Sequence, residues 1–314
     1  DYLKCFEDAT GRDLSHFSLW WHQAGTPVIS VESSYDPSAA TLSLTLKQKT
    51  PPTPGQTEKR PLHIPLRVGL VGPNGDDMEP TAVSGGERTE DVLHLVEAEQ
   101  TFVFEGIGAR PAISANRDFS APVKIDFDQT HEDRLAVARF ETDLVARWDA
   151  INSLALQTLV EATSAARAGE PVSADPALGD ILIATAADET LEPAFRALAL
   201  NLPSELDIGR EIGRDIDPDA IHRARRGVFD ALARKGADSF GRLVDGFSHA
   251  GEFSPDAESA GRRALKNVAL AYMVAGGRDP APAPHAYDTA TNMTDMLAAL
   301  RILAHQFPEA DETA

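Results

Sequence analysis

The stretch "TLSLTLK", from Thr41 to Lys47, decides the fold of the first half of the chain. Leu42, Leu44 and Leu46 alternate with polar side chains, which is the period-two pattern of a strand with one buried face. The same period marks the neighbouring segments "VISV" (28–31), "LHIPLRVGLV" (62–71), "VLHLVEA" (92–98), "TFVF" (101–104) and "APVKIDF" (121–127). We therefore expect about seven short strands, as in an antiparallel sandwich.

Turn residues separate these segments. Pro73-Asn74-Gly75 and Gly85-Gly86 predict tight reversals of the chain. The proline-rich "KTPPTPGQTEKRP" (49–61) predicts a long ordered loop. These features together predict an immunoglobulin- or fibronectin-like β-sandwich domain over residues 25–127.

After Asp128 the pattern changes to the period of a helix. Apolar residues recur every three or four positions and predict one long helix with Trp148 as a buried anchor; they are Val137, Phe140, Leu144, Trp148, Ile151 and Leu154. The multidomain chain thus combines an all-β part with an all-α part.

Later helix starts share one pattern, in which a capping side chain precedes a proline. The pairs Asp175-Pro176, Asp217-Pro218 and Ser254-Pro255 follow it, at intervals of about 40 residues, the size of a helical-hairpin repeat. We predict a HEAT- or armadillo-like α-solenoid over residues 128–314, with "GGRDPAPAPHAY" (276–287) as a flexible loop before the last helix.

The first 24 residues have a helical pattern that stops at Gly25-Thr26-Pro27. Because the chain begins with Asp1 rather than Met, we expect a piece of a longer protein with residues 1–24 as a helical stub of the preceding domain. The single cysteine, Cys5, excludes an internal disulfide and is expected to serve packing. This usage fits a reducing, cytoplasmic compartment.

The formal charge of −20 disfavours binding to nucleic acids or to anionic membranes, which requires clustered Lys and Arg. The basic segment "HRARRG" (222–227) is expected to be the solvated face of a helix. No apolar run approaches the roughly 20 residues that span a membrane.

His131 and Glu132 form the first half of the zinc-binding pattern H-E-x-x-H, but Leu135 occupies the place of the second histidine. Acidic residues such as Glu132 and Asp133 are also typical of the first turn of a helix, where they interact favourably with its dipole. We therefore interpret the segment as a helix start and predict no catalytic, cofactor-binding or metal-binding residue in this chain.

Other motifs are incomplete. "DIDPDA" (215–220) lacks the sixth-position glycine and twelfth-position glutamate of a calcium loop and is interpreted as a helix cap. "GIGARP" (106–111) lacks the third glycine of a dinucleotide fingerprint. The histidines include no pair three or four residues apart, and they are His16, His22, His63, His94, His131, His222, His249, His285 and His305.

Several unusual stretches resemble the bacterial aminopeptidase N family of zinc metallopeptidases. "EDATGRDLSHFSLWWHQAGTP" (7–27) resembles the end of its catalytic domain. Three further stretches resemble the family's β-sandwich domain; they are "TPPTPGQTEKRPLHIPL" (50–66), "AEQTFVFEGI" (98–107) and "RDFSAPVKIDF" (117–127). Three others resemble the family's helical C-terminal domain; they are "ARWDA" (146–150), "LALNLPSE" (198–205) and "TNMTDMLAAL" (291–300).

The resemblance implies that the zinc ligands, the substrate-amine motif G-x-M-E-N and a transition-state tyrosine precede residue 1. It implies zinc in the parent enzyme, none in this chain, and a helical domain that restricts entry to small peptides. The chain alone is then inactive, and its partners are the missing catalytic and N-terminal domains and the parent's peptide substrates.

Two alternatives remain open. A free-standing sandwich and solenoid can present a concave surface to a peptide or protein, whereas an independent enzyme would require the His131–Glu132 site to function. An incomplete solenoid would also leave apolar side chains of its last helix uncovered and promote self-association; the candidates are Met293, Met296, Leu297, Leu300 and Leu303.

Overall fold

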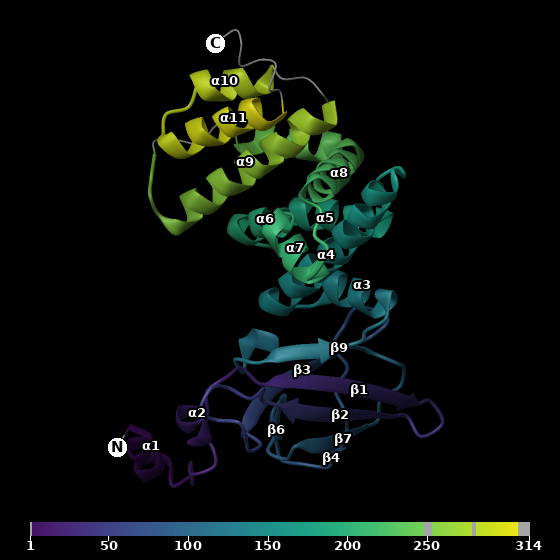
Figure 1. The fold of residues 1–314 in the computed structure, drawn as a ribbon, viewed down its shortest axis with the longest axis vertical. Helices are drawn as coiled ribbons and strands as arrows, with labels where there is room; N and C mark the ends of the chain where they lie inside the picture. The colour runs from purple at the N-terminus through teal and green to yellow at the C-terminus, as the bar shows by residue number, and fades with distance from the viewer. Residues whose placement is uncertain (1, 248–252, 278–280, 307–314) are drawn as a thin grey trace. The chain divides into compact units, whose positions relative to one another are not determined.

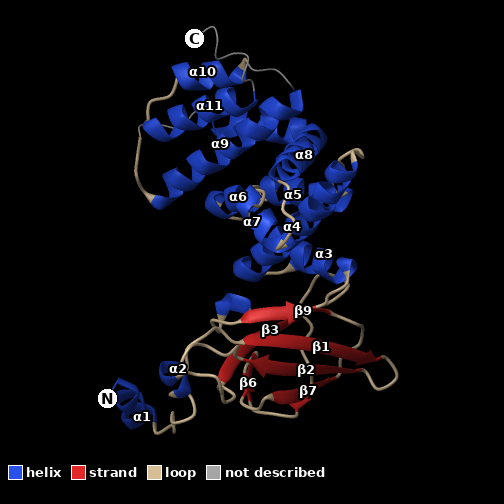
Figure 2. Ribbon diagram, viewed as in Figure 1, coloured by secondary structure: helices blue, strands red, loops and turns tan. Residues whose placement is uncertain are grey.

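The computed structural model describes residues 2–247, 253–277 and 281–306. It divides into two compact units, Asp1–Ala150 and Ile151–Ala314. The first contains a β-sandwich with helices before and after it, and the second contains helices (Figures 1 and 2). The domain limits at residues 24 and 127 remain predictions.

Two sheets form the sandwich, with strand orders β4-β7-β2-β1-β9 and β5-β6-β3-β8. The strands are β1 (Val28–Asp36), β2 (Thr41–Lys49), β3 (Ile64–Val71), β4 (Ala82–Ser84), β5 (Arg88–Thr89), β6 (Val92–Leu95), β7 (Glu99–Glu105), β8 (Ala112–Ala115) and β9 (Lys124–Phe127).

The alternation in β2 is confirmed, because Leu42, Leu44 and Leu46 are all buried in the sandwich core. The sequence did not predict β4, β5 or β8. The first two have three and two residues, and β8 is buried almost throughout, so none shows a clear period. The predicted antiparallel order fails in one place, where β9 runs parallel to β1.

The N-terminal segment forms two helices, α1 (Tyr2–Thr10) and α2 (Leu19–His22). Leu19 contributes to the sandwich core. The expected packing role of Cys5 is wrong, since its side chain is exposed. No residue of α1 is buried, so Cys5 has no apolar core to pack against.

Hydrogen bonds donated by Lys59 hold the proline-rich loop in place. Its Nζ donates to the Ala24 carbonyl and to the side-chain oxygens of Thr53 and Gln56, each at 2.8 Å. The same loop accepts a hydrogen bond from the side chain of Gln23, at the Arg60 carbonyl. These contacts attach the loop to the end of α2, as expected of an ordered loop rather than a free one.

The single long helix predicted after Asp128 is wrong. The structure has α3 (His131–Phe140) and α4 (Leu144–Ala168) instead. Asp143 separates them, because its carboxylate accepts a hydrogen bond from the Ala146 backbone N–H and caps α4 (2.7 Å). Trp148 is half-buried rather than a buried anchor.

The helices after α4 are α5 (Pro176–Ala187), α6 (Pro193–Ala199), α7 (Glu205–Ile212), α8 (Pro218–Phe247), α9 (Ala257–Gly277), α10 (Pro282–Asp288) and α11 (Met293–Gln306). Asp175 and Asp217 cap α5 and α8, as predicted. The Ser254 cap is wrong, since Asp256 accepts the hydrogen bond from the Ser259 backbone N–H (2.9 Å). The loop predicted over residues 276–287 contains part of α9 and α10, while residues 278–280 lie outside the described residues.

The second unit is built around the contact of α8 with α9. Tyr272 is fully buried there and stacks on Phe240, with ring centroids 4.6 Å apart. Its hydroxyl donates to the Leu200 carbonyl after α6 (2.8 Å), so one side chain links three helical segments. Among the described helices, none combines the length and apolar character needed to cross a bilayer.

Candidate functional site

The segment "HED" lies at the first turn of α3, as predicted. Thr130 is the N-cap, and its hydroxyl accepts a hydrogen bond from the Asp133 backbone N–H at 3.1 Å. His131 and Glu132 are exposed, and Leu135 is half-buried on the same helix. The side chains of this turn therefore act as a helix start.

Asp133 also binds an arginine of the sandwich. Two nitrogens of Arg110 donate to its two carboxylate oxygens, at 2.7 and 2.6 Å. Burial alone would raise the pKa of Asp133, but the hydrogen bonds from Arg110 and Thr130 hold this pKa below its ordinary value. Arg110 belongs to "GIGARP", which connects β7 to β8, so this motif positions a helix through its arginine.

A second arginine, Arg117, is buried between two carboxylates. Its Nη1 and Nη2 donate to Asp77, each at 2.7 Å, and its Nε donates to Glu141 at 3.0 Å. Burial lowers the pKa of Arg117, but the two carboxylates together raise it above its ordinary value. The link connects the sandwich to the segment between α3 and α4.

Gly69 makes room for this arginine. A Cβ atom added at Gly69 would lie 1.8 Å from the Arg117 Cζ atom, so any larger residue would collide with the guanidinium group. The sequence stretch that begins at Arg117 was identified, but its partners were missed. Asp77 is 40 positions away and Glu141 is 24, and no local pattern connects them.

Three of the scattered histidines come together in the first unit. The Nε2 atom of His63, the residue before β3, lies 2.8 Å from Nδ1 of His94 on β6. The ring of His16, which precedes α2, lies 6.1 Å from that of His63 between centroids. The antiparallel register of β3 and β6 creates this cluster, so the sequence spacing alone did not reveal it.

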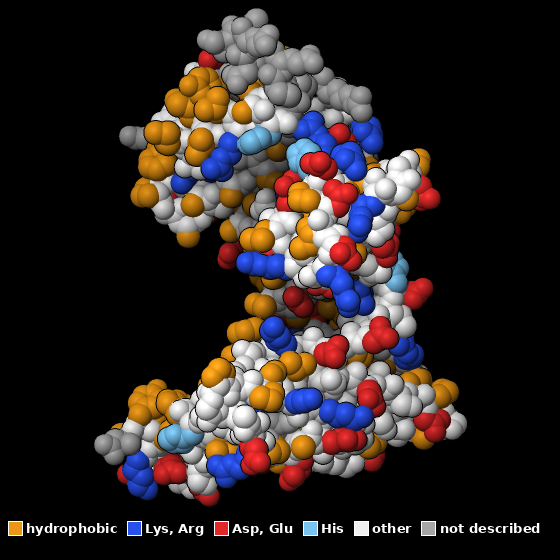
Figure 3. Space-filling model, viewed as in Figure 1, with side chains coloured by type: hydrophobic (Ala, Val, Ile, Leu, Met, Phe, Trp, Pro, Cys, Tyr) orange, Lys and Arg blue, Asp and Glu red, His pale blue; other side chains and the backbone are white. Residues whose placement is uncertain are grey.

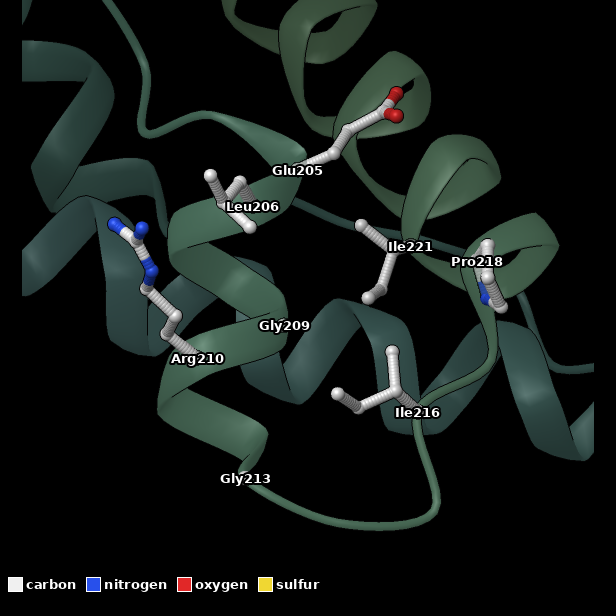
Figure 4. A pocket seen from close by; sticks show the side chains of 8 residues that line it. All are labelled: Glu205, Leu206, Gly209, Arg210, Gly213, Ile216, Pro218 and Ile221. Atoms are coloured by element: carbon white, nitrogen blue, oxygen red, sulfur yellow. The ribbon is translucent and has the colours of Figure 1, made fainter.

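A pocket of about 390 Å³ lies beside α7 in the second unit. Its apolar lining comes from Leu206, Ile216, Pro218 and Ile221, and Figure 4 shows Ile216 and Ile221 pointing into it. Glu205 lies at the rim, and its carboxylate is 2.9 Å from the Nδ1 atom of His222. The pocket therefore offers mainly apolar contact, with Glu205 and Arg210 as its charged lining residues.

The remaining motifs serve the helical architecture. Asp217 of "DIDPDA" caps α8 by accepting a hydrogen bond from the Ala220 backbone N–H (3.0 Å). "HRARRG" lies on α8, where Arg225 donates to the Pro203 carbonyl (2.8 Å) and Arg226 pairs with Asp230 (3.3 Å). Within the described part of the chain, no three His, Cys, Asp or Glu side chains are placed to hold a metal ion.

Family models match both parts of this architecture. Residues 25–128 match "Domain of unknown function (DUF3458) Ig-like fold", and residues 131–314 match "Domain of unknown function (DUF3458_C) ARM repeats". The chain therefore belongs to the DUF3458_C family, with the Ig-like domain in front of the ARM repeats.

Three curated proteins are similar to this chain over nearly its whole length. The chain is 34% identical to aminopeptidase N of Escherichia coli over 99% of its length, and 33% identical to that of Haemophilus influenzae over 96%. It is 38% identical to aminopeptidase N of Caulobacter vibrioides over 95%. The family resemblance inferred from the sequence is thus confirmed.

The chain spans about a third of each of these relatives, 36%, 34% and 33% of their respective lengths. A solved structure of Legionella pneumophila aminopeptidase A has the same fold, with a TM-score of 0.77 at 23% identity. That match covers 98% of this chain and 35% of the Legionella chain.

Proposed function

We propose that this chain is the non-catalytic scaffold and access-gating portion of an aminopeptidase N-like zinc exopeptidase. The whole protein would release N-terminal residues from peptides. The main support for the proposal is the extent of the sequence matches. Nearly all of this chain aligns with only about a third of each aminopeptidase N relative. The fold and the two arginine links support the scaffold role.

In the proposed full-length aminopeptidase, a zinc ion would activate the water molecule that hydrolyses the peptide bond. The residues described for this chain do not fit such a site, because they include no group of three metal-ligating side chains placed together. No step of the reaction is therefore assigned to this chain. Its own contribution is to hold α3 and the start of α4 on the sandwich through Arg110 and Arg117.

A second candidate function is a free-standing module that binds peptides or proteins. The apolar pocket beside α7 favours it, because Ile216 and Ile221 can contact an apolar side chain of a ligand. The coding sequence on either side of this chain separates the two hypotheses. An H-E-x-x-H motif upstream in the same frame supports the aminopeptidase, and a start codon close to Asp1 supports the module.

The proposed partners follow from the first hypothesis. They are the catalytic and N-terminal domains of the same longer chain and the peptide substrates of that enzyme, in the cytoplasm, without nucleic acid or membrane. Copies of this chain would also associate through α11, whose Met293, Leu297 and Leu300 are exposed at successive turns. Figure 3 shows apolar side chains gathered over α10 and α11.

The access-gating role is tested on the full-length protein with alanyl peptides of increasing length and with a folded protein that begins with alanine. We expect zinc-dependent release of alanine from short peptides and little release from the folded protein. Equal rates on both substrates would refute the gate, and absence of turnover on every substrate would refute the aminopeptidase assignment.

A further inference from the structure

The N-terminal segment, residues 2–23, meets the sandwich at the beginning of β3. Leu19 inserts into the sandwich core. Trp20 Nε1 donates to the His63 carbonyl at 2.8 Å, and His16 Nε2 donates to the Pro61 carbonyl at 3.0 Å. The position of His63 therefore determines part of the surface on which the segment docks.

The rings of His63 and His94 are hydrogen-bonded to each other, and this bond forms only in some protonation states of the two rings. One imidazole nitrogen must donate its proton to the lone pair of the other, so the pair can carry at most one positive charge. The Nε2 atom of His94 lies 3.2 Å from the Thr89 hydroxyl, which can donate or accept and so satisfies either tautomer. A second proton would place two N–H groups against each other across 2.8 Å.

The surroundings of His63 oppose its charged form. Its ring is partly buried and meets the ring of Phe17 edge-on, with centroids 6.1 Å apart. Burial lowers the pKa of His63 below its ordinary value, His94 and His16 lower it further, and Glu87 opposes them. A histidine with a lowered pKa stabilises the folded arrangement above pH of about 6.5, and this contribution is lost as the pH falls below that value.

We propose that the His63–His94 pair is a proton-operated latch: it fixes residues 2–23 on the sandwich while at most one ring is protonated, and it loosens their docking at Trp20 when both rings are protonated. When both rings carry a proton, the N–H groups of His63 and His94 oppose each other, and the His63 ring must turn away from His94 and from Phe17 toward water. This movement displaces the His63 carbonyl, to which Trp20 is bound. The latch depends on contacts within the first unit and is independent of the proposed aminopeptidase function.

The single cysteine provides the test. Cys5 is exposed on α1, so a fluorescent dye attached to it reports the mobility of the segment. We expect the dye anisotropy of the full chain to fall as the pH is lowered from about 8 to about 5, with a midpoint below about 6.5. The far-ultraviolet circular dichroism should stay constant over this range, because the sandwich and the helices remain folded.

His63→Gln and His94→Gln each keep a hydrogen-bonding group at the contact and leave a single imidazole there, so two ring N–H groups can no longer oppose each other. Each variant should therefore lose the pH-dependent step and retain high anisotropy. Either variant decides the question if the other does not fold. His131→Gln, a substitution of an exposed histidine on α3, should retain the step. A step that persists in a folded glutamine variant, the absence of a step in the unmodified chain, or a parallel loss of dichroism would overturn the proposal.

Discussion

The Arg117 Nε atom donates to the Glu141 carboxylate across 3.0 Å, and Glu141 is only 1% exposed. This pair joins the end of the sandwich to the short segment between α3 and α4. Both charges are withdrawn from water, so neither tolerates the loss of its partner. The pair lies at the helix break that interrupts the apolar stripe after Phe140, beside the Asp143 cap of α4.

Glu141→Ala should destabilise the chain by about 1.5–3 kcal/mol, the range for a hydrogen bond to a charged group, because Asp77 still pairs with the guanidinium of Arg117. Glu132→Ala is the matched control, since Glu132 is exposed in the first turn of α3, and should cost less than about 1 kcal/mol. Urea unfolding measures both. Equal losses for the two variants would show that the Glu141 pair contributes little.

Gly69→Ala should destabilise by about 1–3 kcal/mol, the usual cost of overpacking. Arg117 cannot easily move from the added methyl group because two carboxylates hold it. Gly108→Ala is the control, because nothing lies within 4 Å of a Cβ atom added there. Thermal or urea melts that fail to distinguish the two variants would contradict the assigned role of Gly69.

The Asp133–Arg110 link should make stability depend on acid pH. Because the pKa of Asp133 is lowered in the folded state, its contribution is present above the ordinary aspartate pKa and is lost as the pH falls through the folded value. Asp133→Asn should cost about 1.5–3 kcal/mol at neutral pH, the range for a hydrogen bond to a charged group. The difference between variant and parent should disappear in strong acid, which urea melts at several pH values will show.

Trp148→Ala should cost about 1–3 kcal/mol, the range of an ordinary destabilising substitution, because Trp148 is half-buried. Leu154→Ala, further along α4, removes a side chain that is only 1% exposed and should cost about 2–5 kcal/mol. A larger loss for Trp148→Ala in the same denaturant series would restore its role as the anchor of the helix.

Self-association through α11 should weaken when its apolar face acquires charge. Met293 is 76% exposed, and Met293→Asp with Leu297→Asp should reduce the sedimentation-detected dimer at high protein concentration. Leu206→Asp, at an exposed position on α7, should leave association unchanged. A monomeric parent chain at every concentration would refute association itself.

Local patterns predicted much of this fold. The leucines of β2 and the aspartate caps of α5 and α8 depend on neighbours within a few residues, so their sequence patterns were sufficient. The Ser254 cap failed because Asp256, two positions later, offers an equally suitable side chain. The proline-rich composition after α9 is typical of a loop, although Pro282 is suited to the first turn of α10.

Long-range contacts were beyond such patterns. The pairing of Glu141 with Arg117 joins residues 24 positions apart, and the histidine cluster depends on the pairing of β3 with β6. The helix-start interpretation of "HED" needed only local chemistry, whereas the partner of Asp133, Arg110, is 23 positions away. Sequence reasoning therefore predicted elements better than the interactions that join them.

The most direct test of the central claim compares metal content and peptidase activity of this chain with those of the full-length protein. Both are soaked with zinc, dialysed and assayed with a chromogenic alanyl anilide. We expect stoichiometric zinc and turnover only in the full-length protein, and no effect of His131→Ala on this chain beyond a small change in stability. Zinc retained by this chain and turnover that disappears with His131→Ala would contradict its assignment as a non-catalytic portion.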